Sequence, residues 1–455
     1  MRFILATLVA KIVRKSVRLA GRGQGSSLPG EIALRIEPRY LKLAAQQITR
    51  IVLIAGTNGK TTTARVLTSA LRVSGQRVVA NAEGANMPGG VAAALAARIN
   101  LFGKLCADTA VIECDEDALP SIAAALTPHI LVLTNLFRDQ LDRYGEVDAI
   151  AKRWQQVIKK LPKKSILVAN ANDPRLVQLC SQAPAEVVYF GVDSARILGT
   201  PNLTAADAVR CPECGGDLGG SRFMAHLGVL RCQNCKFATP EPDVIVKNYV
   251  PKGFESSRVG LVVQGEHLEL ETSLIGRFNA LNIAAAATAA QALHLPRKFF
   301  IQGAKTAARA FGRGEHLLIN GRQVFLSLAK NPTGYNEVLR AIHDVDQAPF
   351  LLLALNDNWA DGQDVSWIWD VDFEAVAPLA KQIATSGLRA GDLAVRLEVA
   401  GVTREIQVLP QLRPALDDVL QKKNKDPLHI IASYTAMLEL RKIMADQGLV
   451  TQWHS

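Results

Sequence analysis

The chain has 455 residues, of which 49% are hydrophobic and 21% charged, and this composition indicates a folded protein rather than a disordered one. It is too long for a single hydrophobic core, so we expect two or three domains. Lysine and arginine total 52 against 42 aspartate and glutamate residues, and the formal net charge of +10 favours an anionic partner, whether nucleotide, phospholipid headgroup or nucleic acid.

The first 23 residues predict a basic amphipathic helix. Apolar side chains recur there at helical spacing, and no acidic residue precedes Glu31. Lys11 interrupts the apolar run well before the roughly 20 residues that a transmembrane helix needs, and no signal-peptide cleavage site follows. The helix either packs on its own protein or binds an anionic membrane surface, and both alternatives stay open. The apolar positions are Leu5, Leu8, Ile12 and Leu19, and the cations are Arg2, Lys11, Arg14, Lys15 and Arg18.

Residues 51–63, IVLIAGTNGKTTT, predict a buried strand, a glycine-rich turn and the start of a helix. This is the pattern of a phosphate-binding loop, in which glycines let the backbone approach an anion, Lys60 adds positive charge and Thr61 can hold Mg²⁺. The common pattern has glycine where this chain has Ile54, so GTNGKT is a shortened variant. The alternative is a strand, turn and helix without a ligand. The candidate nucleotide-binding residues are Gly56, Thr57, Asn58, Gly59, Lys60, Thr61 and Thr62.

From residue 50 to about residue 310, short apolar runs alternate with helical stretches, which predicts a parallel sheet with helices on its faces. Ligands of such sheets bind at the carboxyl ends of the strands. Two runs end there in polar groups: residues 109–116 in Glu113, and residues 129–135 in Thr134 and Asn135. Glu113 is therefore a candidate Mg²⁺ ligand, and an ordinary surface ion pair is the alternative.

Two C-x-x-C pairs, CPECGG (211–216) and RCQNC (231–235), are separated by a segment of hairpin length. This spacing predicts a zinc ribbon with a closed, structural site, because four thiolates leave no position for a catalytic water. A redox pair needs only one C-x-x-C, and a nucleic-acid-binding ribbon would be richer in basic and aromatic residues. The candidate zinc ligands are Cys211, Cys214, Cys232 and Cys235.

The other three cysteines, Cys106, Cys114 and Cys180, lie in apolar segments and are predicted to be buried thiols. This cysteine usage favours a reducing cytoplasm. A second α/β unit is expected after a linker at residues 311–315, with strands near 323–329 and 349–357.

The loop, together with VIECDE (111–116), TNLFRDQLDRYGE (134–146) and GRFNALNIAAAA (276–287), resembles the ATP-binding domain of the Mur ligases and folylpolyglutamate synthetases. Those enzymes use ATP to convert a carboxylate into an acyl phosphate, which an amine then attacks. The resemblance implies that Lys60 and Thr61 hold phosphates and Mg²⁺ and that Glu113 binds Mg²⁺. It also implies nucleotide contacts from Asn279, Asn282, Arg313, Lys330 and Asn331.

Three departures from ordinary Mur ligases stand out. About fifty residues precede the loop, whereas the family normally has a full domain there for a UDP-linked substrate. Gln140 replaces the metal-binding histidine of a D-H-L-D motif, and Ser327 replaces an aspartate before the later motif. The number of Mg²⁺ ions and the position of a carbamylated lysine therefore stay open.

These departures, the cysteine-rich insertion and residues 356–374 are similar to one branch of the family. The resemblance implies amidation of the α-carboxylate of D-glutamate in the peptidoglycan stem peptide of lipid II, with ammonia from a separate GatD-like glutaminase subunit in a heterodimer. By this pattern Asp364 completes the catalytic triad of the glutaminase, while Lys60 and Glu113 serve the ligase reaction. Trp367 and Trp369 suit an interface, although alternating tryptophans also fit the packed side of a strand.

The predicted fold is α/β: a Mur ligase-like central P-loop ATPase domain with an inserted four-cysteine zinc ribbon, and a Rossmann-like C-terminal domain. The expected boundaries are 1–48 for the N-terminal helix and lead-in, 49–312 for the ATP-binding domain with the ribbon at about 208–240, and 313–455 for the C-terminal domain that contacts the glutaminase. The expected cofactors are ATP, Mg²⁺ and Zn²⁺, in a cytoplasmic protein that does not bind nucleic acid. Two other functions stay open: a stand-alone amino acid ligase and a nucleic-acid-binding ATPase.

Overall fold

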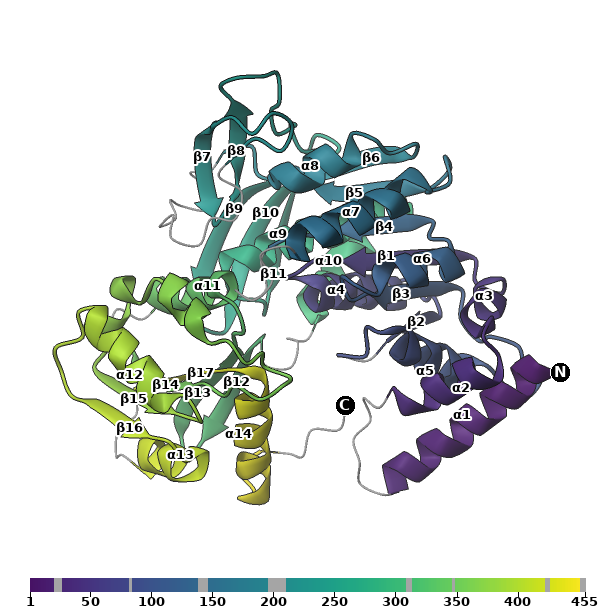
Figure 1. The fold of residues 1–455 in the computed structure, drawn as a ribbon. Coiled ribbons are helices and arrows are strands. Elements are labelled where there is room, and N and C mark those ends of the chain that lie inside the picture. The colour runs from purple at the N-terminus through teal and green to yellow at the C-terminus, as the bar shows by residue number, and fades with distance from the viewer. Residues whose placement is uncertain are drawn as a thin grey trace.

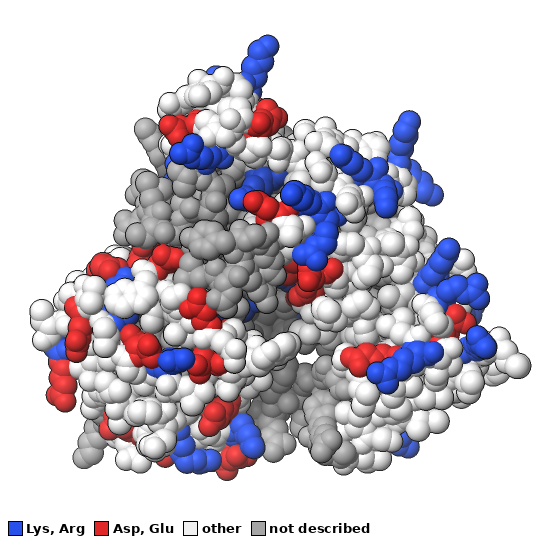
Figure 2. All heavy atoms as spheres, in the orientation of Figure 1, with Lys and Arg blue, Asp and Glu red and all other residues white. Residues whose placement is uncertain are grey.

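The computed structural model describes residues 1–19, 27–81, 84–137, 146–194, 210–307, 313–345, 348–421 and 426–450 (Figure 1). In these residues the strands form one large sheet, one smaller sheet and a separate two-stranded hairpin. In the view of Figure 2, acidic side chains are most frequent over the smaller sheet's unit at the lower left, and basic side chains over the helices of the large sheet at the upper right.

The large sheet contains the predicted parallel strands. Its described strands are β1 (Arg50–Ala55), β2 (Val78–Ala80), β3 (Thr109–Glu113), β4 (Ile130–Leu133), β5 (Ile166–Asn170), β6 (Glu186–Gly191), β9 (Val244–Lys252), β10 (Ser256–Val263) and β11 (Glu266–Thr272). They lie in the order β11-β10-β9-β6-β5-β4-β1-β3-β2. Among these strands, β10 runs antiparallel to both of its neighbours, β9 and β11, which differs from the expectation of a parallel sheet. A turn at Gln264 and Gly265, both with positive φ, joins β10 to β11 and is too short for a parallel crossover.

Helices cover both faces of this sheet, and β1 is therefore buried on both sides. Val52 and Ile54 pack with helices α4 and α9, whereas Leu53 and Ala55 point to the opposite face. The helices of the first face are α4 (Lys60–Val73), α9 (Arg277–Ala292) and α10 (Arg297–Thr306). Those of the second are α1 (Arg2–Leu19), α2 (Leu28–Ile36), α3 (Tyr40–Ala45), α5 (Pro88–Arg98), α6 (Leu119–Leu126), α7 (Glu146–Lys159) and α8 (Pro174–Cys180).

The predicted N-terminal helix is present as α1 and forms the outermost layer over α2 (Figure 1). It packs through small residues, Ala6, Thr7 and Ala10, and the Thr7 hydroxyl lies 2.9 Å from the hydroxyl of Tyr40. The apolar stripe identified in the sequence does not make this contact, since Leu5, for example, is exposed. No helix in the described part of the chain is long and apolar enough to cross a membrane.

The smaller sheet belongs to the predicted second unit. Its described strands are β12 (Arg313–Ile319), β13 (Arg322–Leu328), β14 (Phe350–Ala354), β15 (Gln382–Ser386), β16 (Ile406–Leu409) and β17 (Leu428–Ala432). The order is β12-β13-β17-β14-β15-β16, and only β12 is antiparallel to its neighbour. Arg313 therefore begins a strand, although residues 313–315 were predicted as linker, because the backbone pairs with Ser327. The described helices are α11 (Pro332–His343), α12 (Ala390–Val399), α13 (Leu412–Gln421), α14 (Tyr434–Asp446) and three 3-10 turns, η4 (Ser366–Asp370), η5 (Phe373–Ala375) and η6 (Ala377–Leu379).

The hairpin of β7 (Leu218–Met224) and β8 (Leu227–Cys232) comes from the segment between β6 and β9. Among the remaining cysteines, Cys114 and Cys180 are buried as predicted. The prediction was wrong for Cys106, whose thiol is exposed because it follows a surface turn at residues 100–104.

Candidate active site

The predicted phosphate-binding loop joins β1 to α4. Gly56 and Gly59 have φ values of 145° and 89°. A Cβ atom on Gly56 would lie 1.9 Å from Thr134 Oγ1, and one on Gly59 would lie 2.1 Å from Asn282 Oδ1. The loop therefore requires glycine at both positions, for backbone conformation and for space. Beyond it, the first-turn N–H groups of α4 are directed at the site where an anion would bind.

The end of β4 fixes the shape of this loop. The Thr134 hydroxyl donates to the carbonyl of Asn58 at 2.7 Å. The amide side chain of Asn135 accepts from Asn58 N at 2.8 Å and donates to Asn58 O at 3.0 Å. The hydroxyl of Thr57 donates to Phe137 O at 3.1 Å. Thr57 and Asn58 thus hold the loop rigid, and the polar residues predicted beside it do lie there.

The carboxyl end of β3 brings an acidic group to the same edge, because Ile54 of β1 pairs with Glu113. The Thr61 hydroxyl donates to Glu113 Oε2 at 2.8 Å, and Asn81 fixes Glu113 by two backbone hydrogen bonds of 2.9 Å. A hydroxyl oxygen and a carboxylate oxygen together match the ligands that Mg²⁺ prefers. Asn81 was not among the candidate residues, although its position directly after a strand gives a signal of the same kind as that of Glu113.

Lys60 is anchored inside the loop. Its ammonium group donates to Gly56 O, to Thr57 O at 3.1 Å and to Glu116 Oε2 at 3.3 Å. Both members of the ion pair are largely buried, with 11% of the Lys60 side chain and 15% of the Glu116 side chain exposed. Glu116 therefore orients the lysine.

Asn279 and Asn282 lie on one side of α9 and are both buried. Asn282 Nδ2 donates to Asn279 Oδ1 at 3.0 Å, and Asn279 Nδ2 donates to the carbonyl of Ile275 at 2.6 Å. The Thr63 hydroxyl contacts the Asn282 carbonyl at 3.3 Å, so α9 is tied directly to the helix that follows the loop.

A cavity that opens to solvent lies between the loop and the smaller sheet's unit. Thr61, Thr62 and Asn282 line it from the large-sheet side, and Ser327 and Glu337 line it from the other. Burial raises the pKa of Glu337 to about 7, although the neighbouring Arg340 guanidinium, 3.1 Å away, acts in the opposite direction.

The second unit contacts the large-sheet unit through α11. Arg277, at the start of α9, donates two hydrogen bonds to Asp344, at 3.1 Å from Nε and 2.9 Å from Nη2. Arg340 donates to the carbonyl of Phe223 at the end of β7, at 3.1 Å. These contacts hold the two walls of the cavity together.

Three predicted nucleotide contacts are not placed in the cavity. The Asn331 side chain caps α11, accepting from Gly334 N at 2.7 Å. Lys330 is not among the described residues that line the cavity. For Arg313 only the backbone belongs to the described part, and Gln140 lies outside the described residues. The roles of Arg313 and Lys330 stay predictions.

Asp364 lies in the loop that follows β14 at the carboxyl edge of the smaller sheet. Its Oδ1 accepts from Ser366 N at 2.7 Å and so begins η4. The buried Asp361 anchors the loop by accepting from Thr435 N at 2.8 Å. Trp367 is buried, whereas Trp369 is half exposed over the guanidinium of Arg396. The suggestion of a packed strand for these tryptophans was wrong, because the segment forms a 3-10 turn.

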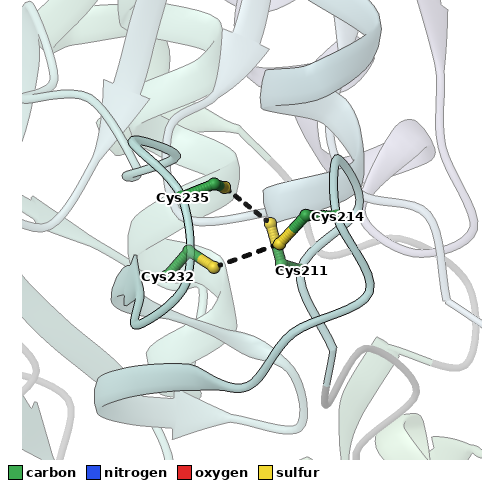
Figure 3. A group of neighbouring side chains, drawn as sticks. All are labelled: Cys211, Cys214, Cys232 and Cys235. Atoms are coloured by element: carbon green, nitrogen blue, oxygen red, sulfur yellow. Dashed lines mark hydrogen bonds between the residues drawn. The ribbon is translucent and has the colours of Figure 1, made fainter.

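The four cysteines of the C-x-x-C pairs face one another (Figure 3). Cys211 Sγ lies 3.6 Å from Cys235 Sγ, and Cys214 Sγ lies 3.5 Å from Cys232 Sγ. A tetrahedral zinc site with Zn–S bonds of about 2.3 Å needs sulfur atoms roughly 3.8 Å apart, so the donor set and spacing fit Zn²⁺. The N–H groups of Asn234 and Phe237 point at Cys232 and Cys235 and would support thiolates.

The other end of this hairpin is buried in the large-sheet core, which the sequence did not predict. Met224 and Leu227 line the cavity beside the loop. The intervening His226 has its Nε2 3.3 Å from the carboxylate of Asp173. Burial raises the pKa of Asp173, but His226 and the N–H groups of Leu136 and Leu176 outweigh this and hold it below its usual range. The sequence signal was the apolar run FMAHL between the cysteine pairs.

Comparison with known proteins gives matches along most of the chain. The profile of the Mur ligase middle domain matches residues 54–210, and that of the MurT ligase C-terminal region matches residues 328–437. The chain is 33% identical over 443 residues to the lipid II isoglutaminyl synthase (glutamine-hydrolyzing) subunit MurT of Streptococcus pneumoniae, covering 95% of each protein. It is also 33% identical to the corresponding subunit of Staphylococcus aureus, covering 88% of this chain and 89% of that one.

Solved structures share the fold at low identity. A pseudomurein peptide ligase type C from Methanothermus fervidus has a TM-score of 0.66 at 20% identity, covering 88% of this chain and 79% of that one. The folylpolyglutamate synthase of Mycobacterium tuberculosis, solved with ADP, has a TM-score of 0.62 at 15% identity, covering 92% of this chain and 95% of that one. The α/β fold is therefore that of the Mur ligases, as predicted.

Proposed function

The chain belongs to the MurT family of Mur ligases, and we propose that it is the ligase subunit of a lipid II isoglutaminyl synthase. In this reaction ATP and ammonia convert the α-carboxylate of D-glutamate in the stem peptide of lipid II into an amide. The observation that carries the proposal is the rigid anion-binding loop with Thr61 and Glu113 in contact beside it. The stand-alone amino acid ligase and the nucleic-acid-binding ATPase have no comparable support.

The chemistry proceeds in two steps at the loop. An oxygen of the substrate carboxylate attacks the γ-phosphorus of ATP and ADP leaves, which gives an acyl phosphate. Ammonia then attacks the acyl carbon and inorganic phosphate leaves, while the ammonia loses a proton. Thr61 and Glu113 would hold Mg²⁺, which neutralises charge on the transferring phosphoryl group. Lys60, oriented by Glu116, and the N–H groups of α4 stabilise the same charge.

The remaining nucleotide contacts are assigned by the family resemblance and by proximity. Asn282 faces the loop from α9, and Asn279 accepts a hydrogen bond from Asn282; both would bind the nucleotide. Arg313 and Lys330 would join them from the second unit. Closure of the two units protects the acyl phosphate from water, and the contacts of α11 with Arg277 and Phe223 hold such a closed arrangement.

Ammonia would come from a GatD-like glutaminase subunit in a heterodimer. Asp364 would reach across the interface and orient the imidazole of the glutaminase. Two features support this role: the anchored loop presents Asp364 beside η4, and the large apolar side chains of Trp359 and Trp369 are exposed near it in the sequence. Exposed tryptophans are typical of interface centres.

We also propose that the chain has three parts and one insertion. Residues 1–48 form an N-terminal helical region, and residues 49–312 form the ATP-binding domain. A Rossmann-like domain at 313–455 contacts the glutaminase. The insertion at about 208–240 is a zinc ribbon in which Cys211, Cys214, Cys232 and Cys235 bind one structural Zn²⁺. The protein would work in the cytoplasm, and its lipid-linked substrate brings the reaction to the inner face of the plasma membrane.

Reconstitution tests the function directly. The purified chain is combined with the candidate glutaminase, lipid II, ATP, Mg²⁺ and glutamine, and amidation of the stem peptide is followed by mass spectrometry. Amidation should stop when any single component is omitted, and free ammonium at high pH should replace glutamine and its glutaminase. Product formation without ATP, or coupling of an amino acid in place of ammonia, would refute the proposal.

A further inference from the structure

The outward side of α1 is apolar. Leu5, Ile12 and Leu19 have exposed fractions of 53%, 66% and 80%, and they lie on the side opposite to the residues that pack on α2. The solvent side of a helix on a globular protein is normally polar. Here small residues make the intramolecular contact, and the large apolar residues are left outside.

A neighbouring turn extends this apolar face. Leu101 and Phe102 are 66% and 89% exposed at the tip of the turn formed by residues 100–104. The turn lies against α1, because a Cβ atom on Gly103 would be 2.9 Å from Cγ1 of Ile4, which is itself exposed. Two segments about one hundred residues apart in sequence therefore build one continuous apolar patch.

Basic side chains accompany the patch on both of its segments. Lys11 and Lys15 lie beside the apolar stripe on α1, Arg2 precedes it, and Lys104 is the last residue of the turn. The segment before Glu31 contains no acidic residue. In Figure 2 the surface over α1, at the lower right, is largely white, and both basic and acidic groups lie along its upper edge. An apolar face bordered by cations matches the boundary between acyl chains and anionic headgroups.

We propose that the outward face of α1 and the turn at residues 100–104 dock this protein on the surface of an anionic phospholipid bilayer. The helix lies in the plane of the interface with Leu5, Ile12 and Phe102 inserted among the acyl chains, and Lys11 and Lys15 contact headgroups. The docking does not depend on the proposed catalytic activity. It would keep the ligase on the membrane that contains a lipid-linked substrate.

Vesicle flotation tests the surface. The full chain is mixed with vesicles of phosphatidylglycerol and phosphatidylcholine, or of phosphatidylcholine alone, and the bound fraction is measured after centrifugation. We expect strong binding to the anionic vesicles only. The double variant Leu5→Ser/Ile12→Ser should bind them at least about tenfold more weakly, because two apolar side chains that insert into the bilayer are lost. Lys11→Gln/Lys15→Gln should reduce the anionic preference by a similar factor.

A matched control lies on another helix. Val395 and Val399 on α12 are 53% and 64% exposed, close to the values for Leu5 and Ile12. The variant Val395→Ser/Val399→Ser should bind vesicles as the unaltered chain does. Unfolding temperatures establish that each variant is folded.

Three results would overturn the proposal. The first is that the unaltered chain does not float with anionic vesicles. The second is that Leu5→Ser/Ile12→Ser floats as well as the unaltered chain. The third is that adding the purified glutaminase subunit abolishes vesicle binding and protects Phe102→Cys from a thiol reagent in a Cys106→Ser background, because the subunit then covers this patch.

Discussion

The ion pair between Arg277 and Asp344 predicts that nucleotide affinity depends on contact between the two units. Two parallel hydrogen bonds join the residues, and 26% and 17% of their side chains are exposed. Arg277 begins the helix that carries Asn279, and Asp344 ends α11, which contributes Glu337 to the cavity. Breaking the pair should therefore favour an open arrangement that binds ATP poorly.

The magnitude follows from the geometry. An exposed ion pair contributes up to about 1 kcal/mol, and the loss of one partner from a buried pair costs roughly 3–5 kcal/mol. This partly buried, bidentate pair lies between those limits, so a coupling energy of about 1–2 kcal/mol is expected. This corresponds to a loss of roughly 5- to 30-fold in the population of the closed arrangement and in ATP affinity.

A double-mutant cycle measures the coupling. Arg277→Ala, Asp344→Ala and the double variant are compared with the unaltered chain by calorimetric titration with Mg²⁺ and a non-hydrolysable ATP analogue. Arg389→Ala is the control, since it breaks a pair with Asp357 that lies wholly within the second unit, and its affinity should not change. A coupling energy below about 0.3 kcal/mol would refute the reasoning, because independent sites also deviate from additivity by about this amount.

The other predictions concern four single residues. Glu113→Gln should lower amidation on the order of 100-fold, measured by product analysis, while leaving glutamine hydrolysis by the partner intact. Asp364→Asn should lower glutamine hydrolysis on the order of 100-fold in a glutamate-release assay, and unchanged turnover would exclude a shared triad. Cys214→Ser should release zinc, seen by metal analysis, and lower the unfolding temperature; it should also weaken ATP binding, because the same hairpin lines the cavity. Glu337→Gln tests a pH effect. The folded-state pKa of about 7 lies above the ordinary 4.5, so the native state holds the proton more tightly, and the free energy of unfolding should fall between about pH 4.5 and pH 7 and level off above. For the unaltered chain, urea denaturation should show that the free energy of unfolding decreases by at most about 3 kcal/mol over this range, and for the variant this decrease should be absent. The same decrease in the variant would show that other groups cause it.

The sequence predicted the residues at the carboxyl edge of the large sheet well. Gly56, Glu113 and Thr134 are far apart in the chain, but each directly follows or ends an apolar run, and parallel strands bring such positions together. Local chemistry was therefore sufficient to place them. The same reasoning applied to β2 would have found Asn81.

Other features depend on tertiary packing that a pattern does not contain. The apolar periodicity of α1 predicts a helix but not which side packs, since Ala6 and Ala10 allow closer approach than Leu5 and Ile12. The capping of α11 by Asn331, by contrast, is a local feature of an asparagine before Pro332, and a nucleotide contact of this residue stays a prediction.

The hairpin tip at Met224 and Leu227 has a consequence for inhibitor design. Met224 and Leu227 belong to the cysteine-rich insertion, so a ligase of the same fold that lacks this insertion would lack these two side chains. A compound that binds this cavity and extends an apolar substituent onto these two side chains would gain affinity from the insertion. Selectivity among the related ligases would then come from the insertion rather than from the shared loop.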